Sequence, residues 1–411
     1  MEPLLPSDPK HELEDLAVDV LRLSSALGVR LREPTRSSVA ELLRPMNSYY
    51  SNLIEGHSTH PIEIDAALRA EAAGGDPGQQ QLQHEALAHI AVQRLLDERL
   101  EKEPGLAICT PEFLCWLHGE FYQRMPRQLR KVRGPHDEEV EVVPGALRAV
   151  DVQVGRHVPP HHRSLDRFLA RFAEVYEPSR LGKLERVVAA AAAHHRLAWI
   201  HPFVDGNGRV ARLFTDAYLA RAEIDGHGLW TASRGLARRR DDYFAALAAA
   251  DEARRNDYDG RGALSDQGLR QFCAFFLRSA LDQISFMGSL LDLDALEARI
   301  ERFAELLTYR EGLPPSTRDL LRDVMLRGSV PRGEMARITG TSERSARTLT
   351  SRLAGLRLLI SDTPKGPVRL GFPLHAVGYY FPRLYPENVE QSFSGEPSAT
   401  PRRRRRPAAR R

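Results

Sequence analysis

Twelve consecutive residues, HPFVDGNGRVAR from His201 to Arg212, bring together side chains suited to phosphate chemistry. A histidine, with an ordinary pKa of about 6.5, can take a proton from a hydroxyl near neutral pH. Asp205 offers the hard oxygen ligand that Mg²⁺ uses when it bridges carboxylates and substrate phosphates. Arg209 and Arg212 are three residues apart, so on a helix they share one face and can clamp a di- or triphosphate. An ordinary helix junction with a glycine turn and surface arginines would explain fewer of these positions.

Two helices must hold this segment. Residues 184–200 are rich in alanine and lack Pro and Gly, which predicts a mostly buried helix. Pro202 disfavours helical geometry at His201, and residues 205–208 (DGNG) predict a turn. A second helix should restart at about Gly208. Its unpaired N–H groups favour an anion, so Asn207 and the N–H groups of its glycine neighbours can hold phosphate oxygens.

The segment matches the Fic-domain pattern H-P-F-x-[DE]-G-N-G-R-x-x-R at every specified position, and the chain resembles the Fic family. The resemblance implies a mainly α fold that transfers AMP from ATP, with Mg²⁺, to a Ser, Thr or Tyr hydroxyl of a target protein. It implies that His201 deprotonates the hydroxyl and that Asp205 holds the Mg²⁺ between the α- and β-phosphates. Arg209 would neutralise the β-phosphate and Arg212 would meet the γ-phosphate. The implied anion hole consists of Gly206, Asn207 and Gly208. Such catalysis is mostly positioning and charge stabilisation.

A second motif lies upstream, in NSYYSNLIEGHSTHP, where Ser51 and Glu55 fall four residues apart and Gly56 follows. On a helix that spacing puts both side chains on one face. The segment resembles the inhibitory motif [ST]-x-x-x-E-[GN] of self-restrained Fic proteins. The resemblance implies that Glu55 pairs with Arg212 and displaces the γ-phosphate, so that inhibition acts within the chain. A solvated glutamate at a helix end is the alternative.

Residues 146–162 are the best candidate for the β-hairpin flap that the resemblance implies. Val150, Val152 and Val154 alternate with polar residues as in a half-buried strand, Gly155 offers a turn, and Pro159–Pro160 leave an edge open to an extended peptide. The target would dock on Val154, Gly155, Arg156, His157 and Val158. His157, His161 and His162 also suggest a metal, but without Cys or HExxH-type spacing a polar loop is favoured.

At 411 residues the chain is long for one domain. Helical patterns fill residues 11–100, with breaks at EPTRSS (33–38) and AAGGDPGQQ (72–80), and continue at 111–123, 164–175 and from 184 to about 307. We expect an N-terminal helical region (1–100) that contains the inhibitory motif, followed by a Fic catalytic core (101–308).

Residues 314–374 predict three short helices and then two strands, an order that resembles a winged helix-turn-helix. Its candidate recognition helix carries Arg344, Arg347 and Arg352, and its wing carries Lys365 and Arg369. Such a module can bind DNA phosphates, but winged helices also serve in protein contacts, so both alternatives stay open. Residues 394–411 predict a disordered basic tail. Seven arginines lie in 402–411, and without those ten residues the chain would carry −4 instead of its net charge of +3. The tail can add salt-dependent affinity for nucleic acid.

No apolar run approaches the about 20 residues of a membrane helix, and residues 1–16 lack a signal sequence, so we expect a cytoplasmic protein without a membrane partner. Cys109, Cys115 and Cys273 predict buried free thiols. The expected partners are ATP and a target hydroxyl, while DNA and a homodimer stay open. The prediction is an autoinhibited protein adenylyltransferase that also modifies itself. The alternatives are a Fic-core nucleotide sensor that regulates through DNA, or an enzyme that removes AMP.

Overall fold

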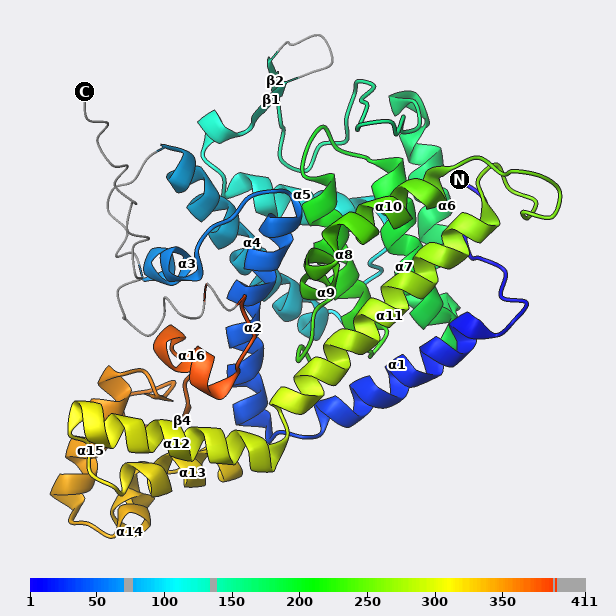
Figure 1. Cartoon of the computed structure of the whole chain (residues 1–411). Helices are drawn as coiled ribbons and strands as arrows, with labels where there is room; N and C mark the ends of the chain where they lie inside the picture. Colours follow the sequence, from blue (N-terminus) through cyan, green and yellow to red (C-terminus); the bar gives the residue numbers. More distant parts are fainter. Residues whose placement is uncertain (70–76, 134–138, 387–388, 390–411) are drawn as a thin grey trace, which may run out of the picture.

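The computed structural model describes residues 1–69, 77–133, 139–386 and 389, and its architecture is mainly helical, as predicted (Figure 1). The strands of the described residues form two small antiparallel sheets of two strands each. In the same residues no helix combines the length and apolar character needed to cross a bilayer.

The N-terminal region consists of four helices, which are α1 (Glu12–Gly28), α2 (Glu33–Ile54), α3 (Pro61–Leu68) and α4 (Pro77–Lys102). The predicted break at EPTRSS was wrong, because these residues form the first turns of α2. Pro34 fits there, since a proline in the first turn removes an N–H that has no partner within the helix. The chain instead breaks at residues 29–32. Most of the second predicted break, residues 72–76, lies outside the described residues, and α4 already begins at Pro77.

The helices that follow build the core around α7. They are α5 (Pro111–Gln123), α6 (Leu165–Tyr176), α7 (Lys183–Ile200), α8 (Asn207–Arg221), α9 (Ala232–Arg238), α10 (Arg240–Asp251) and α11 (Asp266–Leu290), with short 3₁₀ turns at Arg127–Leu129, His162–Ser164 and Pro178–Arg180. Ala189 to Ala193 on α7 are buried, and their small side chains let α1, α6, α8 and α11 pack closely around this helix. These helices therefore support α7, whose C-terminal end leads into the loop that begins at His201.

The hairpin lies elsewhere than predicted. Strand β1 (Lys131–Arg133) pairs antiparallel with β2 (Glu139–Glu141), whereas Val150 and Val152 belong to no strand. Arg148 gives a physical reason: its buried guanidinium donates to the carbonyl oxygens of Val150 and Pro160, which a strand ladder would otherwise use. Of the predicted flap, a tight turn remains, in which Val154 and His157 exchange two backbone hydrogen bonds of 3.0 Å around Gly155.

Residues 293–380 form a lobe at the lower left of Figure 1. The elements are α12 (Leu293–Glu311), α13 (Thr317–Arg327), a 3₁₀ turn (Arg332–Glu334), α14 (Met335–Thr339), α15 (Glu343–Gly355), β3 (Leu359–Ile360), β4 (Arg369–Leu370) and α16 (Leu374–Tyr380). We expected α12 in the core, up to residue 308, but it packs mainly against α13 and α16. Three helices followed by an antiparallel strand pair is the order expected for residues 314–374, and α16 was not anticipated. The predicted tail, 394–411, lies outside the described residues.

Candidate active site

The loop between α7 and α8 carries the predicted chemical groups. His201 closes α7 with a left-handed backbone (φ 51°), and Gly206 precedes α8 with φ 79°. The side-chain amide of Asn207 accepts from the N–H of Phe203 (2.9 Å) and donates to its carbonyl oxygen (2.8 Å). This amide therefore pins the loop and is not free to hold a phosphate, contrary to what we expected of the side chain. The main-chain N–H groups at the start of α8 remain for an anion.

Helix α5 supports the loop from behind. The Tyr122 hydroxyl donates to Oδ2 of Asp205, and a Cβ added to Gly206 would overlap the Tyr122 ring, so glycine is required there for space as well as for its backbone angle. His118 stacks on Phe203 with ring centroids 4.1 Å apart. Sequence reasoning found α5 as a helix but missed these two residues, because nothing in their spacing links them to a loop about 80 residues later.

His201 opens into a cleft of 1020 Å³, which Glu55, Gly208 and Arg212 also line. Burial lowers the pKa of His201 to about 4. The imidazole is therefore neutral near pH 7 and has a lone pair to accept a proton. Arg148 donates to the carbonyl oxygen of His201 (2.8 Å) and so fixes the backbone from which the ring projects.

Asp205 is the candidate metal ligand. Its Oδ2 accepts from Tyr122 and lies 3.4 Å from Nη2 of Arg209, whereas Oδ1 makes no hydrogen bond in the part of the chain that the structure describes. The side chain is 38% exposed. One accessible carboxylate oxygen beside an anion-binding helix end fits Mg²⁺, which keeps several waters and takes few protein ligands besides substrate phosphates.

Arg212 is held by the upstream motif. Its Nε donates to Ser51 Oγ (2.8 Å) and its Nη2 to Glu55 Oε1 (2.5 Å), while its own side chain is 2% exposed. A Cβ added to Gly208 would overlap the Glu55 carboxylate, so this carboxylate lies on the first turn of α8. Burial alone would raise the pKa of Glu55, but the charge and hydrogen bond of Arg212 lower it overall. An ionised carboxylate thus occupies the place that suits an anion. Gly56, next in the chain, has φ 87° and only ends the helix.

Arg209 is turned towards α4 and α5. Its Nη1 lies 3.4 Å from Glu85 Oε2, and its guanidinium stands 5.1 Å from the ring centroid of Phe121. Together with Asp205, these neighbours leave Arg209 only 8% exposed. The two arginines of the motif therefore point in different directions, each to a different glutamate of the N-terminal region.

The turn predicted to dock the target lies on the same cleft. Val154, Arg156, His157 and Val158 all line it, with Gly155 at the tip of the turn. His157 Nε2 lies 2.8 Å from the carbonyl oxygen of Trp199, which ties the turn to the end of α7. Tyr243 and Phe244 of α10 line the cleft too and were not anticipated. The other histidines of this loop, His161 and His162, both contact Asp151.

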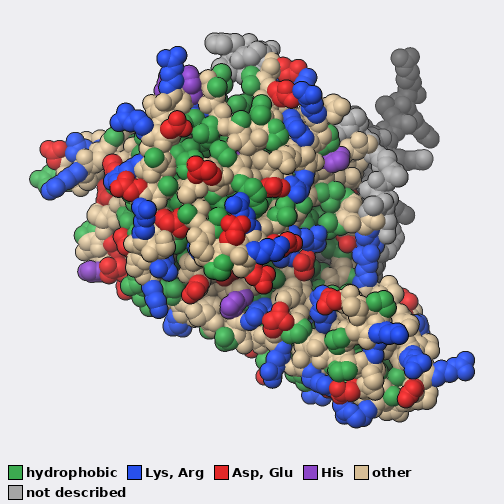
Figure 2. Space-filling view, turned by 180° about the vertical axis from the view of Figure 1, so that it is seen from behind, with side chains coloured by type: hydrophobic (Ala, Val, Ile, Leu, Met, Phe, Trp, Pro, Cys, Tyr) green, Lys and Arg blue, Asp and Glu red, His purple; other side chains and the backbone are tan. Residues whose placement is uncertain are grey.

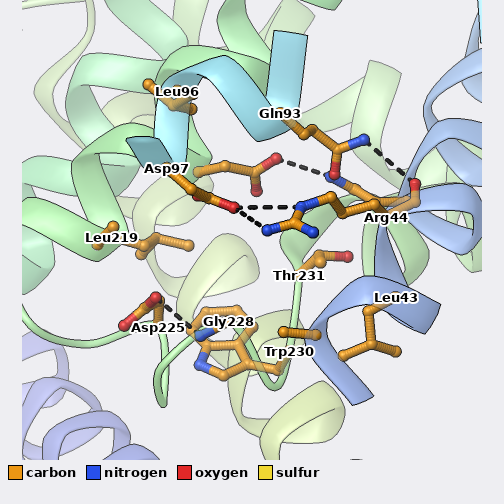
Figure 3. A pocket seen from close by; sticks show the side chains of 14 residues that line it. Leu43, Arg44, Gln93, Leu96, Asp97, Leu219, Asp225, Gly228, Trp230 and Thr231 are labelled. Carbon is orange, nitrogen blue, oxygen red and sulfur yellow. Dashed lines mark hydrogen bonds and ion pairs between the residues drawn. The ribbon is translucent and has the colours of Figure 1, made fainter. Parts of the chain in front are cut away.

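Polar contacts fix α2 against its neighbours. In a second pocket, between α2 and α4, Arg44 pairs with Asp97 (2.6 Å) and Gln93 donates to the Arg44 carbonyl oxygen (3.1 Å), as Figure 3 shows. At the other end of α2, Arg240 of α10 donates to the carbonyl oxygen of Ile54 (2.8 Å). None of the predicted site residues lines this second pocket. Its contacts hold the helix that presents Ser51 and Glu55.

Comparisons with known proteins agree with this geometry. Residues 108–219 match the Fic/DOC family model, so the chain contains a Fic domain. The protein named Protein adenylyltransferase Fic from Nematostella vectensis is 30% identical over 176 residues, which cover 42% of this chain and 37% of that protein. The protein of the same name from Drosophila grimshawi is 41% identical over 93 residues, covering 23% and 19%. The chain thus spans well under half the length of these curated relatives.

A solved structure shares the fold. The crystal structure of a Fic family protein from Desulfovibrio desulfuricans G20 superposes with a TM-score of 0.51 at 17% sequence identity, covering 90% of this chain and 98% of that one.

Proposed function

We propose that this chain is an autoinhibited protein adenylyltransferase, which transfers AMP from ATP to a Ser, Thr or Tyr hydroxyl of a target protein or of itself. The observation that carries the proposal is the Glu55 carboxylate on Arg212 and Gly208, in the same cleft as a neutral His201. The names of the curated relatives support the same reaction.

The proposed reaction uses His201 as the base. Its imidazole takes the proton of the target hydroxyl, whose oxygen forms a bond to the α-phosphorus of ATP, and the bond to the β-phosphate oxygen breaks to release pyrophosphate. The N–H groups of Gly206, Asn207 and Gly208 and the charge of Arg209 stabilise the growing negative charge. Mg²⁺, held by Asp205, would neutralise charge between the α- and β-phosphates. The turn at Val154–Val158 would hold the target backbone beside His201.

Inhibition follows from the charge of Glu55. A γ-phosphate and the Glu55 carboxylate compete for Arg212 and for the start of α8, and two anions cannot share that place at low cost. ATP can then bind only in a pose that Arg212 does not help to orient. Removal of Glu55 frees Arg212, and the rate of transfer should rise.

The type of reaction is tested by the position of the label in ATP. With the Glu55→Gly variant, Mg²⁺ and a cell lysate, label at the α-phosphate should enter protein and label at the γ-phosphate should not. The Glu55→Gly/His201→Ala variant should incorporate neither. Incorporation of γ-label would show phosphoryl transfer instead. Loss of label from pre-adenylylated protein, without any incorporation, would favour AMP removal. ATP binding without either reaction would favour a nucleotide sensor.

The charge of the C-terminal lobe favours a second function, nucleic-acid binding by residues 314–374 as a winged helix-turn-helix. This range holds 11 Lys and Arg against 5 Asp and Glu, in a chain whose net charge is only +3. Figure 2 shows many Lys and Arg side chains over the lobe at the lower right. Arg344 and Arg347 of α15 and Lys365 are exposed.

Two of the predicted contact residues have other partners. Arg352 donates to the carbonyl oxygens of Glu311 and Gly312, and Arg369 donates to Ser38 on α2. The proposal therefore rests on Arg344, Arg347 and Lys365. The Arg344→Ala/Arg347→Ala variant should weaken binding to a DNA duplex and flatten its salt dependence, whereas Arg171→Ala, at an exposed arginine of the core, should not. Wild-type protein that shows no salt-dependent binding would favour a protein-contact role.

A further inference from the structure

Glu85, on α4, is a buried carboxylate beside the predicted site. Its side chain is 3% exposed, and its Oε2 lies 3.4 Å from Nη1 of Arg209 and 2.7 Å from Nδ1 of His57. Its Oε1 accepts from Gln81 (3.2 Å). Burial opposes ionisation of this carboxyl, but the hydrogen bond from His57 and the charge of Arg209 lower its pKa overall. Glu85 is thus an ionised group held in one orientation by three neighbours.

Arg209 depends on such a partner. Its guanidinium is almost fully buried, and within the described residues its Nε has no hydrogen-bond partner. A buried cation requires nearby negative charge, which Asp205 and Glu85 supply on two different nitrogens. Asp205 is the candidate metal ligand and is partly exposed. Of the two carboxylates beside Arg209, Glu85 is therefore the one to which we assign no other role in the site.

Glu85 also differs from Glu55 in its place relative to the cleft. Glu55 lines the cleft and lies on the first turn of α8, whereas Glu85 is not among the lining residues. The Glu85 side chain is 3% exposed, whereas that of Asp205, on the other guanidinium nitrogen, is 38% exposed, so Glu85 meets Arg209 from the buried side. A carboxylate placed there does not compete with a phosphate, and it can fix the direction of the guanidinium.

We propose that Glu85 is a positioning residue: from behind, it holds the Arg209 guanidinium beside the start of α8, where it meets the second phosphate of a bound nucleotide. This inference rests on the proposed function, in which Arg209 contacts the β-phosphate. It predicts that loss of the Glu85 charge weakens the binding of nucleotides that have a second phosphate, and spares AMP.

The test is direct titration of AMP and of ADP into the Glu55→Gly variant and into Glu55→Gly/Glu85→Gln. The added substitution should weaken ADP binding by about five- to tenfold and change AMP binding by less than about twofold, since one charge-assisted contact is lost. Glu55→Gly/Arg209→Ala should show the same split between AMP and ADP, and Glu55→Gly/Glu85→Asp, which keeps the charge, should recover part of the ADP affinity. Glu98→Gln, at an exposed glutamate of the same helix, is the matched control.

Three results would overturn the inference. Equal losses for AMP and ADP would mean that Glu85 only supports the fold. Tighter ADP binding would mean that Glu85 restrains Arg209, and unchanged ADP binding would mean that it does neither. The readout needs no turnover, so it is separate from the proposed reaction. Failure of Glu55→Gly to transfer AMP would refute that reaction. The difference between the effects on AMP binding and on ADP binding would still decide the role of Glu85.

Discussion

Glu55 and Glu85 each form an ion pair with an arginine of α8. Glu55 meets Arg212 at 2.5 Å with a side chain that is 33% exposed, and Glu85 meets Arg209 at 3.4 Å with a side chain that is 3% exposed. Glu55 comes from the end of α2 and lines the cleft, while Glu85 comes from the middle of α4 and does not.

The position of each carboxylate relative to the cleft decides what its ion pair does. A carboxylate that is open to the cleft can be exchanged for a phosphate of similar charge, so its pairing restrains the arginine reversibly. A carboxylate that is buried behind the arginine cannot leave without exposing an unpaired charge, which is costly. We therefore expect the same chemistry to inhibit at Arg212 and to support at Arg209.

The largest effect is expected at the base. In the Glu55→Gly background, His201→Ala should lower AMP transfer by about a hundred- to ten-thousandfold, because it removes the proton acceptor. ADP affinity should stay within about twofold of the Glu55→Gly parent, since both arginines and Glu85 are retained. Steady-state transfer rates and titration of ADP measure the two quantities. Full turnover by this variant would mean that Glu55 restrains something other than base-assisted transfer.

The hydrogen bonds that Ser51 and Gln81 make to the two ion pairs should differ in their effect on AMP transfer. Ser51→Ala removes a buried hydrogen bond to Arg212, so transfer by the otherwise native chain should rise about fivefold. Gln81→Ala removes a hydrogen bond to Glu85 and should cause no rise.

The measurement is AMP transfer by both single variants, with thermal unfolding as the check of folding. A higher transfer rate in both variants would mean that the two glutamates act on their arginines in the same way.

The pH dependence of AMP transfer tests whether His201 is the base. His201 must be unprotonated to act, and burial lowers its pKa to about 4, so the acidic limb should have its midpoint near that value. For Glu55→Gly, kcat/KM should then be nearly flat between about pH 5.5 and 7.5, whereas an ordinary histidine would lower it about tenfold at pH 5.5. A midpoint near an ordinary histidine pKa would contradict the burial of the ring in the free enzyme.

The smallest effect concerns His57, whose Nδ1 lies 2.7 Å from Oε2 of Glu85. Its hydrogen bond to Glu85 raises the pKa of His57 above its ordinary value. The protonated form is therefore favoured on folding, so this contact stabilises the protein fully at low pH and is lost as the pH rises through the raised pKa. In an NMR titration, Glu85→Gln should bring the pKa of His57 down. An unchanged pKa would mean that Glu85 does not control the protonation of His57.

The helices around the loop could be predicted because their signals are local. An alanine-rich run ending at Pro202 and a DGNG turn gave α7 and α8 within one residue at the loop, since helix propensity and backbone restrictions act over a few residues. The contact of Glu55 with Arg212 was expected only because the motif resembles that of a family, and the contact of Ser51 with Arg212 was not anticipated.

The support of the loop could not be predicted, because it depends on contacts distant in the sequence. Tyr122 reaches Asp205 from another helix, and Glu85 reaches Arg209 from α4. The hairpin was misplaced for the same reason: the valine alternation at 150–154 favours a strand locally, but Arg148 binds the carbonyl oxygens of Val150 and Pro160. Tertiary contacts outweigh the local preference there.

We propose that Glu55 restrains the site. This is tested by the initial rate of AMP incorporation from α-labelled ATP, measured for wild type and Glu55→Gly at the same ATP and Mg²⁺ concentrations. Glu33→Gln, at an exposed glutamate in the first turn of the same helix, is the control. We predict a rate about thirtyfold or more above wild type for Glu55→Gly, as expected for loss of a charge-assisted bond to Arg212, and a wild-type rate for the control. Equal rates for wild type and Glu55→Gly would contradict the account.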